Sequence, residues 1–252
     1  MTSNPGEIAS KVPEANAAFW IIKILATTLG ETGGDAVSMS MHLGYLVGTA
    51  IFCVIFIAAV SAQIATKTFR PVPYWITIIA TTTVGTTAAD FATRSLGIGY
   101  PGGSLILLGL LLACLYAWHK ALGSIAIDSI HSPRSERFYW LTILFSQTLG
   151  TALGDWTAIG TGIGFGGATL VFGTALAAIA AARRWTQISR TALFWGAFIL
   201  TRPLGAVVGD LLDKPLAEGG LALSRYAASA AILALIVLLV AILPQRPARQ
   251  PA

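Results

Sequence analysis

Charged residues are scarce in this sequence. Asp, Glu, Lys and Arg make up 11% of its 252 residues, whereas roughly 25% is usual in a soluble domain. Hydrophobic residues reach 55%. This composition excludes an ordinary soluble protein and predicts an integral membrane protein. The chain has no long polar segment from which a second domain could form, so we expect a single membrane domain over residues 1–252.

Cysteine, histidine and catalytic motifs are also in short supply. The two cysteines, Cys53 and Cys114, lie in apolar runs and are interpreted as small buried hydrophobic residues. The three histidines have no metal-ligand spacing. The absence of a nucleophile–base pair, a Walker loop or a redox motif argues against an enzyme and suggests no cofactor. Residues 1–16 lack an apolar core next to a cleavage site, so we expect no cleaved signal peptide.

The chain does have strong internal repetition. Four segments share a Trp followed ten residues later by a Gly and fifteen residues later by an Asp, and they cover residues 20–35, 75–90, 140–155 and 195–210. Agreement at three positions in four copies is not expected by chance. A fold built of copies is therefore predicted.

Eight apolar segments have about the 20 residues that a helix needs to cross a bilayer. They lie at about 17–38, 43–66, 73–94, 103–121, 138–158, 166–184, 192–212 and 221–243. Pairs of spans form the four repeats, at approximately 17–66, 73–121, 138–184 and 192–243. Because each repeat has two spans, successive copies enter the membrane in parallel orientation. The predicted fold class is all-α, with eight transmembrane helices around a pseudo-fourfold axis, or a pseudo-twofold axis of pairs.

The connections between the spans predict the topology. The longest connection, residues 123–137, is the expected hinge between two four-helix halves. Most basic residues, Arg249 among them, flank the side that carries both termini, and by the positive-inside rule both termini are cytoplasmic in a bacterial inner membrane. The net charge of +5 is thereby explained without a nucleic-acid partner. We expect the four repeat tryptophans to form an aromatic belt at this interface, and Lys23 to extend its ammonium toward it.

Two stripes run along the odd-numbered spans. One is made of small residues, which we expect to form the contacts between these spans; its glycines are Gly30, Gly34, Gly85, Gly150, Gly154, Gly205 and Gly209. The other is polar, and in chain order it contains Thr27, Glu31, Asp35, Thr82, Thr86, Asp90, Gln147, Thr151, Asp155, Arg202, Ala206 and Asp210. We expect the polar faces to surround an internal cavity. The aliphatic even-numbered spans should face lipid.

The polar stripe carries the candidate site. The helical rise places the four aspartates, Asp35, Asp90, Asp155 and Asp210, at one depth in the outer half of the membrane. An ionised side chain at a helix centre costs roughly 2.5–3.5 kcal/mol and less toward its ends, so four at one level require a reason. They are either helix caps kept by duplication or a shared ion or proton site, with further oxygen ligands from Glu31, Thr86, Gln147 and Thr151.

Arg202 is the exception in the polar stripe, and it precedes Pro203. Arg202 is then a counter-ion of the acidic cluster, with Asp210 as its expected partner, or a tethered cation that competes with a transported one. With Lys23 included, the region has a formal charge of about −3 if all groups are ionised, which favours bound cations or protons.

The Trp-Gly-Asp skeleton resembles a family of small bacterial membrane proteins made of four copies of a repeat of unknown function. The resemblance covers about residues 17–243 and implies no activity. From the residues we expect transport of a small cation, a divalent metal or a proton-coupled substrate, through the four-Asp cluster. A cation channel with an Asp ring and a non-transporting scaffold or regulatory protein stay open as alternatives. The expected partners are the bilayer and a small cation. Assembly with further copies of the chain is compatible with the sequence.

Overall fold

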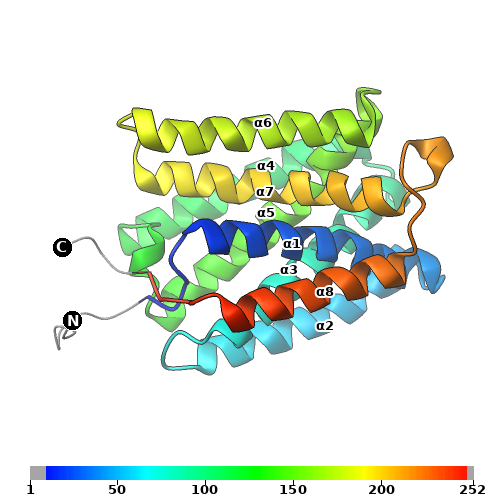
Figure 1. The fold of residues 1–252 in the computed structure, drawn as a ribbon. Coiled ribbons are helices and arrows are strands. Elements are labelled where there is room, and N and C mark those ends of the chain that lie inside the picture. Colours follow the sequence, from blue (N-terminus) through cyan, green and yellow to red (C-terminus); the bar gives the residue numbers. More distant parts are fainter. Residues whose placement is uncertain (1–9, 249–252) are drawn as a thin grey trace.

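The computed structural model describes residues 10–248 and consists of helices throughout its membrane part (Figure 1). Residues 1–9 of the polar N-terminal segment, and Arg249 among the basic residues used to predict topology, lie outside this range. The long helices are α1 Ala17–Asp35, α2 Gly44–Ala65, α3 Pro71–Asp90, α4 Gly99–Leu122, α5 Pro133–Asp155, α6 Gly164–Trp185, α7 Arg190–Asp213 and α8 Arg225–Ile242. They confirm the prediction of eight transmembrane helices in four repeats.

The four odd-numbered helices form a closed ring. Helix α1 packs against α3 and α7, and α5 packs against the same two helices on the other side. Each even-numbered helix covers the odd helix of the next repeat: α2 lies on α3, α4 on α5, α6 on α7, and α8 returns to α1. In Figure 1, α6 runs beside α7 and α8 beside α1. The last repeat therefore closes on the first, which gives the predicted pseudo-fourfold arrangement.

Hydrophobicity distinguishes the four outer helices and α7 from the other three helices of the ring. Five helices are apolar and long enough to qualify as membrane spans by composition alone, namely α2, α4, α6, α7 and α8. The even-numbered helices expose large side chains such as Val54, Leu105, Leu170 and Val237 on the outside, as a lipid-facing layer requires. Helices α1, α3 and α5 are more polar because they bury their polar stripes inside the ring.

Glycines of the small stripe form the seams of the ring, as predicted. A Cβ atom at Gly30 would overlap Thr82 of α3, and one at Gly85 would lie 2.9 Å from the Cβ atom of Gln147 on α5. The series continues with Gly150 against Arg202 and closes with Gly205 against Thr27. At every seam a glycine faces the same repeat position on the next helix, so the absence of a side chain permits the close approach.

The end of each repeat hairpin has a recurrent turn. In the first three repeats, the α-helix ends at the aspartate and continues as a π-helical turn, over Ala36–Ser40, Phe91–Ser95 and Trp156–Gly160. The next helix begins at a glycine with φ of +70° to +76° (Gly44, Gly99 and Gly164), a conformation that other residues adopt only with strain. The fourth repeat differs, because α7 continues to Asp213 without a π-helical turn.

The opposite end of the ring, where the odd helices begin, is called here the terminal end. Its tryptophans do not form an interfacial belt: Trp75, Trp140 and Trp195 are buried, and they pack with Phe19, Tyr74, Trp118, Tyr139 and Phe198 in one aromatic cluster. The prediction of a belt is wrong for these three residues, because they face the neighbouring helices and not lipid. Trp185, on α6, is exposed.

Three chain segments cover this aromatic cluster and are called the terminal lid: residues 10–14, 125–130 and 245–248. The Ser10 amide donates to the Ala248 carbonyl (3.2 Å), and the Lys11 amide donates to the Ile130 carbonyl (2.8 Å). The Lys11 ammonium is buried and lies 2.5 Å from a Glu136 carboxylate oxygen of α5. The segment predicted to be a hinge is thus partly fixed in a lid, because Ile130 is buried under the N-terminal segment.

Candidate functional site

The polar stripes of the four odd helices meet inside the ring. Three layers of buried side chains follow one another along the helices. The first layer contains Thr27, Gln147 and Arg202, and the second contains Glu31, Thr86 and Thr151. The third layer contains the four aspartates. The sequence-predicted site residues therefore share one interior, in layers that follow the helix axis. The end of the ring that holds the aspartates is called here the acidic end.

Arg202 occupies the middle of this interior. Its Nη2 atom lies 3.0 Å from the Glu31 carboxylate and donates to the hydroxyls of Thr86 and Thr151, each at 2.5 Å. These three acceptors come from α1, α3 and α5, so one guanidinium on α7 bonds to all of the other repeats. Pro203 follows within the same helix, and α7 continues past it. A side chain at the centre thus replaces part of the expected cavity.

Glu31 is the carboxylate that neutralises Arg202. The sequence had suggested Asp210 for this role, but the Asp210 carboxylate pairs instead with Lys214, at 3.1 Å. The reason is geometric: Arg202 and Asp210 lie two helical turns apart on α7, whereas Glu31 approaches from α1 at the level that the Arg202 side chain reaches.

Basic residues clamp the four aspartates in two pairs. Arg94 lies 3.0 Å from Asp90 and 2.8 Å from Asp155, and so bridges α3 and α5. Lys214 lies 2.5 Å from Asp35 and 3.1 Å from Asp210, and so bridges α1 and α7. Burial alone would lower the pKa of Lys214, but the carboxylates of Asp210 and Asp35 outweigh burial and raise it. The ammonium therefore stays charged.

A fifth aspartate and a third basic residue complete the acidic end. Arg225, at the start of α8, lies 3.3 Å from Asp213 and 3.9 Å from Asp35. With these included, six carboxylates face five basic side chains, because Arg94, Lys214 and Arg225 join Arg202 and Lys23. The formal charge of the ring interior is therefore about −1, which is less negative than the expected −3. Fewer bound cations are needed to neutralise it than the sequence had suggested.

Three carboxylates are close enough to share one ion. Glu31, Asp35 and Asp210 each offer an oxygen within 4.8 Å of the others, and all three residues are buried. Asp90 and Asp155 are not in this group, so the structure does not bring the four aspartates together as one ligand set. Oxygen ligands of this kind suit hard divalent cations.

Lys23 and Gln147 are buried without hydrogen bonds. Neither the Lys23 ammonium nor either amide atom of Gln147 has a partner among residues 10–248. Lys23 has 0% exposure and lies 4.1 Å above the ring of Phe198. The prediction that Lys23 reaches the interface is wrong, since its side chain faces the ring interior on the same stripe as Thr27 and Glu31.

Sequence reasoning missed the clamps. The sequence pattern assigned no site role to Arg94, Lys214, Arg225 or Asp213. The available signal was spacing, because Arg94 and Lys214 each follow an aspartate by four residues, which is the spacing of a helical ion pair.

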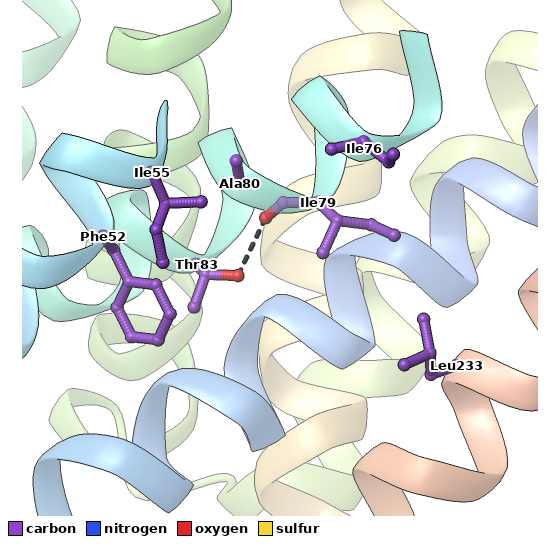
Figure 2. Close-up of a pocket in the computed structure, with 7 residues that line it drawn as sticks. All are labelled: Phe52, Ile55, Ile76, Ile79, Ala80, Thr83 and Leu233. Atoms are coloured by element: carbon purple, nitrogen blue, oxygen red, sulfur yellow. Dashed lines mark hydrogen bonds between the residues drawn. The ribbon is translucent and has the colours of Figure 1, made fainter. Parts of the chain in front are cut away.

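One pocket lies away from these residues, on the outer wall. It has a volume of about 240 Å³ and is lined by apolar side chains of α2, α3 and α8, including Phe52, Ile55, Ile79 and Leu233 (Figure 2). Its one hydroxyl, on Thr83, already donates to the Ile79 carbonyl at 2.8 Å. This pocket lies outside the polar site.

Comparison with protein families gives a match over nearly the whole membrane part. The model of the family described as "Repeat of Unknown Function (DUF347)" matches four times, at residues 18–69, 73–123, 138–189 and 193–244. Each match contains one odd and one even helix. No curated protein and no solved structure matches the chain.

Proposed function

The chain belongs to the family built from this repeat, and we propose that this member is a carrier that moves a small cation across a bacterial inner membrane in exchange for protons. The observation that carries the proposal is the group formed by Glu31, Asp35 and Asp210, whose oxygens lie within 4.8 Å of one another inside the membrane part. The excess of basic residues at the terminal end supports cytoplasmic termini.

Lys214 gives this group the character of an exchange site. Its ammonium lies 2.5 Å from Asp35 and 3.1 Å from Asp210, which is the place a small cation would take between these carboxylates. A cation that enters displaces a tethered positive charge, and when the cation leaves, Lys214 or protons take its place. Buried carboxylates without a counter-charge are costly, which favours coupling of cation release to protonation.

Arg202 favours a carrier over a channel. The guanidinium is fully buried and bonded to α1, α3 and α5 at the ring centre, so the ring does not offer an open path along its axis. A carrier needs this side chain to exchange partners during the cycle, whereas a channel needs a continuous aqueous path.

A second function is supported by one observation. Each of the four aspartates already pairs with a basic side chain, as expected of a scaffold or regulatory subunit whose carboxylates only hold helices together. The two functions make opposite predictions for transport.

Flux into proteoliposomes separates them. Wild-type protein should take up at least one ion from a panel of divalent metals, with a rate that depends on the pH gradient, and Asp35→Asn should abolish uptake. Asp155→Asn, at the same repeat position but outside the group of three, tests whether the second clamp takes part in binding, and Asp128→Asn in the lid is the control. A wild-type protein that moves none of the ions is a scaffold, and flux that follows the electrical gradient alone indicates a channel.

A further inference from the structure

The interior between the aromatic cluster and the aspartate layer has a formal charge of +1 when Lys23 is protonated. Along the four odd helices, this part of the sequence contains three charged side chains, Lys23, Glu31 and Arg202. Glu31 pairs with Arg202 at 3.0 Å. Lys23 has no carboxylate within ion-pair distance in the described chain. A protonated Lys23 is therefore an uncompensated positive charge in a membrane interior, where such a charge is costly without a bound anion.

Unpartnered hydrogen-bond donors accompany this charge. The Lys23 ammonium, the Gln147 amide and the Arg202 Nε–H group are all fully buried, and none of them has a hydrogen-bond partner within residues 10–248. Buried polar groups in native proteins nearly always have partners, from the chain, from water or from an ion. Three donors from α1, α5 and α7 lack acceptors, and the Gln147 amide oxygen accepts from none of them, which suggests that a further acceptor belongs among them.

The ring geometry places these donors near one level. Gln147 and Arg202 hold the same repeat position on the neighbouring helices α5 and α7, and Gly150, one turn beyond Gln147, packs directly on the Arg202 side chain. The Lys23 ammonium lies 4.1 Å from the ring centroid of Phe198, which is one helical turn before Arg202 on α7. The three side chains therefore enter the interior within about one turn of each other.

We propose that this interior holds a small monovalent anion of the halide class, which accepts hydrogen bonds from Lys23, Gln147 and Arg202 Nε–H. A neutral water molecule satisfies the donors but leaves the positive charge, whereas an anion satisfies both. The site adjoins the carboxylate group through the Arg202–Glu31 pair but uses a different atom of Arg202, Nε, and it does not depend on the proposed transport. Its role is to allow two cations, Lys23 and Arg202, to stay buried with one carboxylate.

Thermal unfolding in detergent tests the proposal. Sodium chloride or sodium bromide is compared with sodium gluconate at constant ionic strength and pH, so that the cation is unchanged. The wild-type Tm should rise saturably with halide, on the order of 5 °C. Lys23→Met and Gln147→Leu should lose most of this rise, whatever their own Tm, and Lys120→Met, at an exposed lysine of α4, should keep it.

A bromide soak of crystals supplies the second measurement. An anomalous peak between Lys23 and Gln147 supports the site. A Tm that does not depend on halide, a halide effect that persists in Lys23→Met, or a bromide map without a peak at this position overturns the proposal, and each leaves the cation-flux experiment unaffected.

Discussion

Arg94 and Lys214 occupy the same position of their repeats, and each joins the aspartate four residues before it to the aspartate of the next helix in the ring. The first and third repeats have Met39 and Ile159 at this position. The fourfold ring is therefore twofold at its acidic end, with clamps at the α3–α5 and α7–α1 seams. Movements that open the α1–α3 and α5–α7 seams break neither clamp.

Removal of a clamp should make stability depend on pH. In Arg94→Met, Asp90 and Asp155 face each other without the bridging cation. The two carboxylates repel each other only when both are ionised, so the folded variant favours a state in which one of them holds a proton. The folded variant then binds more protons than the unfolded chain, so its Tm should fall as pH rises from about 5 to 8, more steeply than in the wild type. Arg137→Met, at an exposed arginine of α5, is the control. Parallel pH profiles for the two variants would show that Arg94 does not neutralise the pair.

Loss of Glu31 should be more damaging than loss of an aspartate. Glu31→Gln leaves the fully buried Arg202 guanidinium without its carboxylate, and removal of one partner of a buried ion pair costs roughly 3–5 kcal/mol. Denaturation of the purified protein measures the loss. The double variant Glu31→Gln/Arg202→Met should recover much of it, since no unpaired charge remains. A double variant as unstable as the single one contradicts the pairing.

The seams allow a test by the smallest change. Gly205→Ala and Gly150→Ala add a Cβ atom that overlaps Thr27 and Arg202, so each should destabilise by about 1–3 kcal/mol. Gly109→Ala and Gly173→Ala are matched controls, because no described heavy atom lies within 4 Å of the added Cβ. Alanine is the better helix former, and these controls should be neutral or stabilising in thermal unfolding. Equal effects at all four positions would refute close packing at the seams.

The terminal lid should depend on one buried ion pair. Glu136→Gln removes the carboxylate at 2.5 Å from the Lys11 ammonium and leaves that ammonium with the carbonyls of Gln63 and Ile64. Hydrogen–deuterium exchange at residues 10–14 and 125–130 should become faster, while exchange in the centre of α3 should not change. Glu14→Gln, at an exposed position of the lid, serves as the control. Unchanged exchange in Glu136→Gln would mean that backbone pairing alone holds the lid.

Spacing along one helix explains what the sequence could predict. The Trp-Gly-Asp skeleton and apolar lengths suffice for eight helices in four repeats, because period and length are local properties. The glycine stripe identifies the seam for the same reason. The partner of Arg202 is not local: it depends on which helix lies opposite and at what height, so Asp210 on its own helix was preferred to Glu31 on α1.

The sequence also does not determine whether a side chain faces lipid or a neighbouring helix. Lys23 and Trp75 are residue types that are common at membrane interfaces, yet both are buried, because α8 covers α1 and α2 covers α3. A hydropathy profile does not indicate which helix lies next to a given residue. For the candidate site, the sequence indicated the correct stripe, but the division of its aspartates into two clamped pairs required the ring.

The closure of α8 onto α1 has a consequence for biogenesis. Helix α1 enters the membrane first and carries Lys23, Glu31 and Asp35, but its cover α8 and its counter-charges Arg202 and Lys214 are synthesised last. Until the fourth repeat is synthesised, α3 is thus the one helix of the ring that packs against α1. We expect truncation after the third repeat to leave these charges of α1 unpaired and to make α1 the first segment to be degraded.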